Sequence, residues 1–563
     1  TPSPTPTPTP GSTPTVTITA PQAGVTLTGT VTVTVSASET GKTIIAVGLQ
    51  IDGVTLGTAT NTSPYTFSLN TALFANGPHS LRATAWDAAN NTGNSSPVSV
   101  TFSNSNPGNP AQSGVMSGTV PLPCVSVHAA LLPGARIFMS DGQTCGMNAY
   151  VWNSTTNIVD TVTAPANIFC NGLDQMSDGR LLVAGGHLGS DTGLPIGNIF
   201  DPSTETWTVL PDMAYARWYP QANILPNGNI LVTSGETNCA GCDATVQEIY
   251  NPTTNSWSQL SSAPFFFPYY PRVLDLSDGR VLVAGTSEDP IVSEVLDLNA
   301  LTWTAVGGAA VDGGSAVMYQ PDKILKMGSS ADPSTDTFNS AATAYVLDMT
   351  QPTPTWTPVA SMSYPRTYLN STILPDGTVL VTGGGLYAYP TYLPGAVFPT
   401  ELWSPVTQTW TTLASLSAPR LYHSVALLLP DARVLISGGG RSVGCPDVQN
   451  TDQLSAEFFE PPYLFKGSRP TITAAPAQLS YGQVFTVQTP NAGQIASVSL
   501  IRFGAVTHAF NVGQHFLPLA FTAGSGSLTV TAPANSNLAP PGNYMLFIVN
   551  TNGVPSIAAI LNL

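Results

Sequence analysis

Charged side chains are scarce in this chain. Asp, Glu, Lys and Arg together make up 9% of the 563 residues, and 16 Lys and Arg stand against 32 Asp and Glu, for a formal net charge of −16. A protein that follows a phosphate backbone needs a basic stripe, and the sequence has none. The charge balance therefore excludes nucleic acid as a partner, and an anionic membrane surface for the same reason.

Long hydrophobic runs and amphipathic helical patterns are also missing. No apolar stretch reaches the roughly 18 residues that a membrane-spanning helix needs, so we expect no membrane span. No segment keeps a helical hydrophobic period over about three turns. Gly and Pro, by contrast, contribute 50 residues each. This composition predicts an all-β protein of short strands joined by turns.

Cysteine is too sparse for a scaffold built on disulfides. Cys124 and Cys145 are placed to bridge neighbouring strands, and Cys239-x-x-Cys242 is either a loop disulfide or half of a zinc site that lacks a second pair. If both bridges form, two cysteines remain unpaired: Cys170 and Cys445. An unpaired cysteine in an extracellular protein requires a functional explanation.

The N-terminal part predicts an extracellular module on a spacer. Residues 1–13 alternate Thr and Pro, which favours an extended, semi-rigid linker. Residues 14–104 alternate apolar and polar positions in short runs, the pattern of an immunoglobulin-like sandwich. Residues 105–114 form a second linker by composition. We expect a secreted monomer, free or held at a cell surface, whose N-terminal domain either binds a polysaccharide or cell surface or acts only as a spacer.

An internal repeat occupies the middle of the chain. A hairpin phrase such as SDGRLLVAGG recurs, with its turn residues 44 to 55 positions apart, and a late tryptophan closes several copies. This is the kelch pattern, in which each copy is a four-stranded blade of a β-propeller. Seven copies predict a seven-bladed propeller over residues 115–462, with residues 117–124 completing the last blade. Residues 463–563 return to alternating strands and predict a second β-sandwich. The seven turn residues are Gly134, Asp178, Asn227, Asp278, Asp322, Asp376 and Asp431.

The repeat phase identifies positions that face the propeller axis. Counting eight residues back from each turn reaches the entry to the innermost strand of each blade, and brings a thiol, several phenols and an imidazole to one face of the ring. Tyr422 directly precedes His423 in the sequence and is therefore close to this circle of residues. An imidazole and a phenolate suit Cu(II), which favours N and O ligands, and His508, on a hairpin of the last domain, is a second imidazole. The ring positions are Ser126, Cys170, Tyr219, Tyr270, Gly314, Tyr368 and His423.

Recurring side chains in these blades also have a structural interpretation. The motifs A-R-W-Y, P-R-T-Y and P-R-L-Y repeat in three blades, so Arg217, Arg366 and Arg420 are candidates for packing and ion pairing, as is Tyr368. A single buried thiol is ordinarily inert. Taken one at a time, the ring residues therefore indicate packing as readily as chemistry.

Four ordered motifs resemble those of the galactose oxidase and glyoxal oxidase family of copper-radical oxidases: FCNG (169–172), ARWYP (216–220), LYHSVALLLPDARV (421–434) and LIRFGAVTHAFN (500–511). The resemblance extends over about residues 115–563. It implies a thioether between Cys170 and Tyr219 that carries a tyrosyl radical, and copper held by Tyr219, Tyr422, His423 and His508.

The resemblance further implies the reaction. A primary alcohol or an aldehyde hydrate is oxidised, Tyr422 accepts the hydroxyl proton, a hydrogen atom passes to Tyr219, and dioxygen leaves as hydrogen peroxide. The family's shielding tryptophan has no match between residues 236 and 246, and Trp218 is expected to take its place.

The sugar contacts of galactose oxidase also have no match. The loop FFFPYYPR (265–272) is aromatic instead, so we expect a small aldehyde hydrate or an apolar primary alcohol, with Trp218, Tyr270 and Arg272 as candidate substrate contacts. The alternative is a non-catalytic kelch propeller that binds glycans or mediates adhesion, because a fold does not by itself determine a function.

Overall fold

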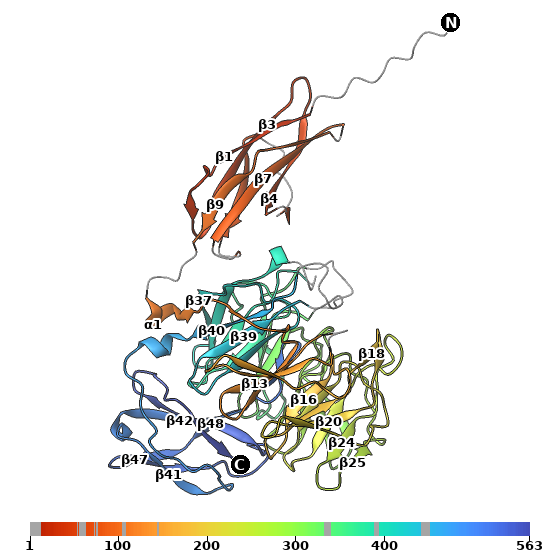
Figure 1. Cartoon of the computed structure of the whole chain (residues 1–563), viewed down its shortest axis with the longest axis vertical. Helices are drawn as coiled ribbons and strands as arrows, with labels where there is room; N and C mark the ends of the chain where they lie inside the picture. The colour runs from red at the N-terminus through yellow and green to blue at the C-terminus, as the bar shows by residue number, and fades with distance from the viewer. Residues whose placement is uncertain are drawn as a thin grey trace. The chain divides into compact units, whose positions relative to one another are not determined.

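The structure is a computed structural model that describes residues 13–563 apart from 53, 56–62, 72–73, 75–76, 90, 104–108, 143–145, 331–338, 388–392 and 441–450 (Figure 1). Regular structure in these residues is almost entirely strand, which confirms the all-β prediction. The chain divides into two compact units, Thr1–Ser105 and Asn106–Leu563. Among the described residues, no helix combines the length and the hydropathy that crossing a membrane requires.

The first unit is a two-sheet sandwich, as predicted for an immunoglobulin-like domain. Alternating burial along Thr15–Ala20 and Thr30–Ser38 sends every second side chain inward. Val33 and Val35 of one sheet and Leu49 and Leu81 of the other pack in a single core. One sheet has the order β1 (Thr15–Ala20), β3 (Thr30–Ser38), β6 (Tyr65–Asn70); the other has the order β2 (Thr26–Leu27), β9 (Val98–Phe102), β7 (Gly77–Asp87), β4 (Ile44–Ile51), β5 (Val54–Thr55), with β8 (Thr92–Asn94) beside β7.

Consecutive four-stranded antiparallel sheets follow in the second unit, one for each of five hairpin repeats. The apolar phrase of the repeat forms the second strand of each sheet; in the first two sheets this strand is Leu181–Ala184 and Ile230–Thr233, and it is buried along its whole length. The sheets are β16 (Gly172–Gln175), β17 (Leu181–Ala184), β20 (Gly197–Asp201), β21 (Thr206–Val209); β22 (Gln221–Ile224), β23 (Ile230–Thr233), β24 (Glu248–Asn251), β25 (Ser256–Gln259); β26 (Val273–Asp275), β27 (Val281–Val283), β28 (Ser293–Asp297), β29 (Thr302–Val306); β30 (Ser315–Gln320), β31 (Lys323–Met327), β32 (Ala344–Asp348), β33 (Thr357–Pro358); and β34 (Asn370–Ile373), β35 (Val379–Thr382), β36 (Pro399–Ser404), β37 (Thr409–Ser415).

Two further sheets of the repeat region combine strands that are distant in sequence. The segment 117–124, predicted to complete the last repeat, contributes β11 (Val120–Pro121), which pairs with β40 (Ser455–Glu460) beside β10 (Val115–Met116), β39 (Val434–Gly438) and β38 (Ser424–Leu428). The other sheet has the order β15 (Ile158–Thr161), β14 (Ala149–Asn153), β13 (Arg136–Ser140), β12 (His128–Leu132), β43 (Ala505–Thr507), β44 (Phe510–Asn511). Its last two strands come from the C-terminal region.

The C-terminal region forms a second sandwich around Val487, Leu500 and Ile548. Its sheets have the orders β41 (Val484–Gln488), β47 (Ser527–Thr531), β46 (Phe521–Ala523), and β45 (Phe516–Leu519), β42 (Ile495–Arg502), β48 (Asn543–Asn550), β49 (Ala559–Asn562).

Short elements complete the described chain: a hairpin of β18 (His187–Gly189) and β19 (Thr192–Gly193), the 3₁₀ turns η3 (Leu393–Gly395), η4 (Pro462–Phe465) and η5 (Ala492–Gln494), and the helix α1 (Pro110–Ser113). This helix lies within the stretch 105–114 that composition predicts as a linker, so the end of that stretch is ordered; Asn109 caps it.

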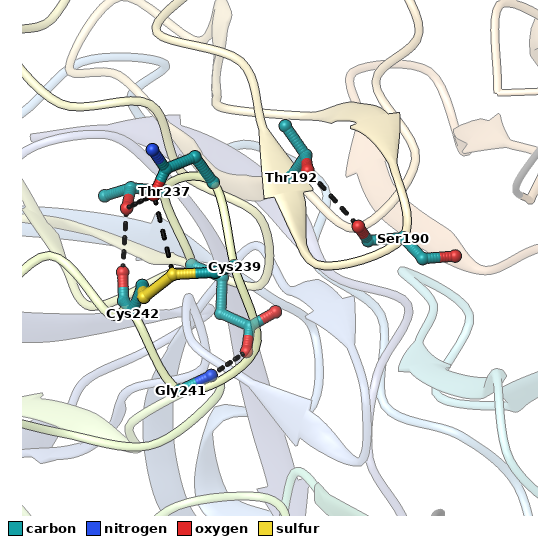
Figure 2. The surroundings of a disulfide bond; sticks show 8 residues. Ser190, Thr192, Thr237, Cys239, Gly241 and Cys242 are labelled. Carbon is teal, nitrogen blue, oxygen red and sulfur yellow. Dashed lines mark hydrogen bonds between the residues drawn. A yellow bond between two sulfur atoms is a disulfide. The ribbon is translucent and has the colours of Figure 1, made fainter.

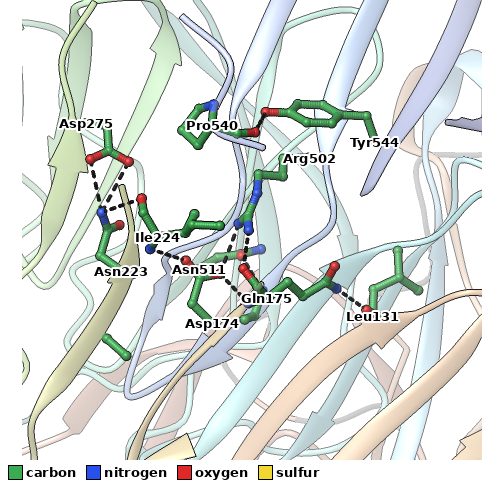
Figure 3. Close-up of polar contacts among 12 residues, drawn as sticks. Leu131, Asp174, Gln175, Asn223, Ile224, Asp275, Arg502, Asn511, Pro540 and Tyr544 are labelled. Atoms are coloured by element: carbon green, nitrogen blue, oxygen red, sulfur yellow. Dashed lines mark hydrogen bonds and ion pairs between the residues drawn. The ribbon is translucent and has the colours of Figure 1, made fainter. Parts of the chain in front are cut away.

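A buried ion pair joins the C-terminal sandwich to the repeat region (Figure 3). Arg502, at the end of β42, donates to Asp174 Oδ1 over 2.9 Å and to the backbone carbonyl of Gln175 over 2.6 Å. Asp174 Oδ2 also accepts the backbone N–H of Ile224. One carboxylate thus connects two neighbouring repeats and the C-terminal sandwich.

The recurring arginines and tryptophans hold the repeats together. Arg217, Arg366 and Arg420 each form a fully buried ion pair with a glutamate at 2.9 to 3.0 Å, so their structural interpretation is confirmed. The late tryptophans connect neighbouring repeats: the indole N–H of Trp207 donates to the Val162 carbonyl of the preceding sheet over 2.7 Å, and that of Trp257 to the Pro211 carbonyl over 2.9 Å. These contacts explain why arginine and tryptophan each recur at their own fixed position in the repeat.

Candidate active site

Five residues at the repeat positions counted from the turns share an unusual backbone conformation. Cys170, Tyr219, Tyr270, Tyr368 and His423 have φ angles of 57°, 67°, 45°, 58° and 65°. A positive φ is uncommon outside glycine and requires support from the surrounding structure. Backbone hydrogen bonds supply part of it, since the N–H of Tyr219 donates to the Cys170 carbonyl over 2.9 Å and the N–H of Tyr270 donates to the Tyr219 carbonyl over 3.0 Å. Each residue lies one to three positions before the innermost strand of its sheet.

Two phenols meet at the centre of this site. Tyr219 Oη and Tyr422 Oη are 2.7 Å apart, although 203 residues separate them in the sequence. Both side chains are buried, and Tyr219 packs with Cys170 in one apolar cluster. The indole of Trp218 stacks on the Tyr219 ring, with centroids 4.4 Å apart and an interplanar angle of 23°. Trp218 therefore covers one face of the Tyr219 ring; its role as a shield stays a prediction.

Two imidazoles face each other beside the phenols. His423 Nε2 and His508 Nε2 are 3.1 Å apart. His423 Nδ1 lies 2.7 Å from the carbonyl oxygen of Gly440, which only accepts, so Nδ1 carries the proton and the lone pair is on Nε2. His508 Nδ1 contacts the hydroxyl of Thr507 at 2.6 Å, which directs Nε2 inward. Cys170 Sγ completes a buried triad whose ligand atoms lie within 4.8 Å of one another.

His508 reaches this site from the C-terminal sandwich. It lies in the turn of the β43–β44 hairpin, where His508 and Ala509 have φ angles of 46° and 66°. Strand β43 pairs with β12, and Thr507 stands opposite His128 in that register. The hairpin is thus held as an extra edge of a repeat sheet, and its tip carries the imidazole to the other site residues.

Burial keeps the site side chains neutral. It raises the pKa of Cys170, Tyr219 and Tyr422 well above their ordinary values and lowers the pKa of His508 well below its ordinary value. A carboxylate, Glu288, adds to the increase for Tyr422. Ionisation of a phenol here therefore needs a nearby positive charge, and a bound cation supplies one.

A small pocket opens onto Tyr422, His423 and His508. The space available to the centre of a water molecule is about 10 Å³, enough for about one water. Glu288 lines the same pocket and is 6% exposed. Sequence reasoning missed Glu288, because it lies in a loop that has no fixed phase relative to the repeat turns.

The predicted substrate contacts occupy different positions. Tyr270 is fully buried, stacks on His508 with ring centroids 4.1 Å apart, and donates its hydroxyl to the Asn171 carbonyl. Arg272 is also fully buried and donates to the carbonyl of Gly314, a residue that lines the pocket. Neither side chain is itself among the pocket-lining residues of the described chain. Trp218 reaches the site through its contact with Tyr219.

The sulfur atoms of Cys239 and Cys242 are joined in a loop disulfide (Figure 2). The zinc half-site interpretation is therefore wrong, because bonded sulfurs are not available as thiolate ligands. Thr237 donates its hydroxyl to the Cys242 carbonyl, and Gly241 N–H donates to Glu236 Oε1. Cys145 and Cys445 lie outside the described residues, so the predicted bridge from Cys124 to Cys145 stays a prediction.

Comparisons with known proteins identify relatives over most of the chain. Family models match residues 469–563 as "Galactose oxidase-like, Early set domain", 326–463 as "Glyoxal oxidase N-terminus", 176–214 as "Kelch motif" and 14–83 as "Bacterial Ig domain". Galactose oxidase of Gibberella zeae is 30% identical over 487 residues, covering 79% of this chain and 69% of that protein. Aldehyde oxidase GLOX of Vitis pseudoreticulata is 27% identical over 464 residues, covering 74% of this chain and 85% of that protein.

A solved structure shares the architecture. It is described as a novel fungal alcohol oxidase with catalytic diversity among the AA5 family, in complex with copper; it superposes with a TM-score of 0.71 at 25% identity and covers 80% of this chain and 100% of that one. Together with the galactose oxidase match, these similarities show that the chain belongs to the galactose oxidase and glyoxal oxidase family of copper-radical oxidases.

Proposed function

We propose that this protein oxidises a small primary alcohol or aldehyde hydrate and reduces dioxygen to hydrogen peroxide, at a copper site formed by Tyr219, Tyr422, His423 and His508. One observation carries the proposal: two imidazole Nε2 atoms 3.1 Å apart and two phenol oxygens 2.7 Å apart meet in one buried site together with a thiol. Four different sheets supply these side chains: Cys170 precedes β16, Tyr219 precedes β22, Tyr422 and His423 precede β38, and His508 lies between β43 and β44.

The donor set fits copper. The lone pair of His423 Nε2 points at His508 Nε2, an arrangement that a cation between them stabilises. Imidazole nitrogen and phenolate oxygen are ligands that Cu(II) favours. The Gly440 carbonyl and the Thr507 hydroxyl orient the two rings from behind, as is typical of metal-bound histidines. Copper, when bound, supplies a Lewis acid and a one-electron acceptor.

Cys170 and Tyr219 supply the second electron acceptor in this proposal. The two side chains share one buried cluster, and a backbone hydrogen bond joins their peptide groups. A thioether between them makes the Tyr219 ring easier to oxidise, and the tyrosyl radical is stored there. Trp218 covers one face of the ring and excludes water from it.

Tyr422 and Glu288 act on the substrate. Tyr422 lines the pocket next to both histidines, so its oxygen is placed to accept the proton of the substrate hydroxyl. Glu288 lines the same pocket and accepts a hydrogen bond from a second hydroxyl. An aldehyde hydrate carries two hydroxyls on one carbon and satisfies both groups, which favours it over a simple alcohol as substrate.

The remaining parts of the chain support this site. The repeat sheets are the seven blades of a propeller over residues 115–462, and the sandwich 463–563 contributes His508. The first unit is a spacer or a polysaccharide-binding domain of a secreted, monomeric enzyme, consistent with the Thr/Pro-rich residues 1–13 and the low lysine content.

Peptide mass spectrometry tests the proposal. Protein loaded with copper in air is digested, and the peptides that contain Cys170 and Tyr219 are expected as one species, lighter by two hydrogens than their sum. Cys170→Ser is the control, with copper bound but the peptides separate. Two unmodified peptides in copper-loaded native protein would exclude the radical cofactor.

A further inference from the structure

His128 lies directly behind the proposed thioether. It is the first residue of β12 and is fully buried, and its backbone stands between Ser140 of β13 and Thr507 of β43. Its Nε2 lies 3.1 Å from the backbone nitrogen of Cys170, in the neighbouring repeat. Sequence reasoning assigned His128 no role, because it falls outside the four motifs and two residues beyond the ring position Ser126.

The hydrogen bond determines the tautomer of His128. A backbone N–H only donates, so Nε2 of His128 accepts, and its ring proton is on Nδ1. The Nε2 lone pair of His128 therefore accepts the backbone N–H of Cys170. This hydrogen bond connects two neighbouring repeats.

Cys170 needs such support. Its φ of 57° lies in the left-handed region, where a side chain other than glycine is strained. Two contacts hold its backbone on either side of Cα: the N–H donates to His128, and the carbonyl accepts the N–H of Tyr219 over 2.9 Å. The second partner is the residue to which the sulfur is proposed to bind. Between these two contacts the Cα–Cβ bond of Cys170 has a defined direction toward the site.

We propose that His128 is a positioning residue for formation of the thioether, holding Cys170 so that its sulfur faces the Tyr219 ring. In the reaction, the S–H bond of Cys170 and one ring C–H bond of Tyr219 break and a C–S bond forms. The two protons and two electrons reduce dioxygen, the oxidant of the proposed function, to hydrogen peroxide. This inference rests on the proposed function but concerns how its cofactor matures.

The rate of crosslinking is the readout. Protein prepared without copper receives Cu(II) in air, and the fraction of crosslinked Cys170 peptide is followed by mass spectrometry. His128→Leu leaves the Cys170 N–H without its acceptor, and we expect crosslinking to slow about tenfold or more. His128→Gln keeps a neutral side-chain acceptor and restores most of the rate. Copper affinity, measured by titration, changes little in both, because His423 and His508 remain.

His187→Leu is the matched control. His187 packs near the same site, with its ring 5.5 Å from Phe169 and 5.8 Å from Trp218, but it does not bond to Cys170. We expect the native rate in this variant. Hydrogen exchange of the peptide around Cys170, measured before copper is added, should be faster in His128→Leu and unchanged in His187→Leu.

Three results would overturn the inference: a native crosslinking rate in His128→Leu, an equal slowing in the Leu and Gln variants, or an equal slowing in His187→Leu. The absence of a crosslink in the native protein would instead refute the proposed function, and this inference with it. Slow crosslinking in His128→Leu with native copper affinity supports the positioning role.

Discussion

Replacing Arg502 by Met tests whether one ion pair anchors the C-terminal sandwich to the repeat region. Arg502 is 1% exposed and contacts Asp174 and the Gln175 carbonyl. Removing one partner of a buried pair ordinarily costs about 3–5 kcal/mol, because the other charge is left uncompensated. In the variant, Asp174 still accepts hydrogen bonds from the backbone N–H groups of Gln175 and Ile224. We therefore expect the free energy of unfolding to fall by about 3 kcal/mol, the lower end of that range.

Urea unfolding measures this loss in the second unit. Eight of the nine tryptophans lie in that unit, so tryptophan fluorescence reports its unfolding. Arg180→Met is the matched control: Arg180 pairs with Asp178 at 2.7 Å, but both side chains are more than one-third exposed, and such pairs contribute about 0–1 kcal/mol. The double variant Arg502→Met with Asp174→Leu should recover part of the loss. If Arg502→Met costs no more than Arg180→Met, the pair does not anchor the sandwich and the reasoning is wrong.

Three further predictions concern the site and a buried charge. Tyr422→Phe should keep copper through the histidines but lose about 10²–10⁴-fold in turnover, measured as peroxide release; undiminished peroxide would remove its role as base. Glu288→Gln should lower kcat/KM about tenfold or more for a small hydrated aldehyde but little for a primary alcohol of the same length, and an equal decrease for both would contradict the hydrate contact. Burial lowers the pKa of Lys326 to about 7 from 10.5, so the unfolded chain binds more protons between these values and native stability should rise with pH there. Lys326→Met should abolish that rise, and urea unfolding at pH 7 and pH 10 checks it.

Much of the fold could be predicted because its determinants are local. The turn carboxylates act on their own hairpins: Asp178 Oδ1 accepts the N–H of Arg180 over 3.1 Å, and Asp376 Oδ1 accepts the N–H of Thr378 over 3.1 Å. Strand alternation and the spacing of turns need only neighbouring residues. The helix α1 was not predicted, because four residues capped by Asn109 carry no periodic pattern.

The candidate site was predicted in part. The repeat phase pointed to Cys170, Tyr219 and His423, and the structure places these residues with Tyr422 and His508 in one buried site. Glu288 and His128 were not predicted. The first depends on the path of a loop, and the second on a contact between neighbouring repeats. Arg272 was expected at the substrate, but the structure buries it against Gly314.

The amino-acid sequence is enough to predict which kinds of domain this protein contains and which residue types stand at the equivalent position of each repeat. Hydrogen bonds in turns and alternating burial act over a few residues, so they can be recognised in the sequence. The tryptophan bonds to the preceding repeat, and it can be recognised because it recurs at the same position of several repeats. The contacts among those residues depend on the three-dimensional packing of the sheets. The 2.7 Å contact of Tyr219 with Tyr422 and the 3.1 Å contact of His423 with His508 join residues 203 and 85 positions apart. Such distances depend on how sheets stack and where a hairpin from another domain inserts, and no local interaction encodes them.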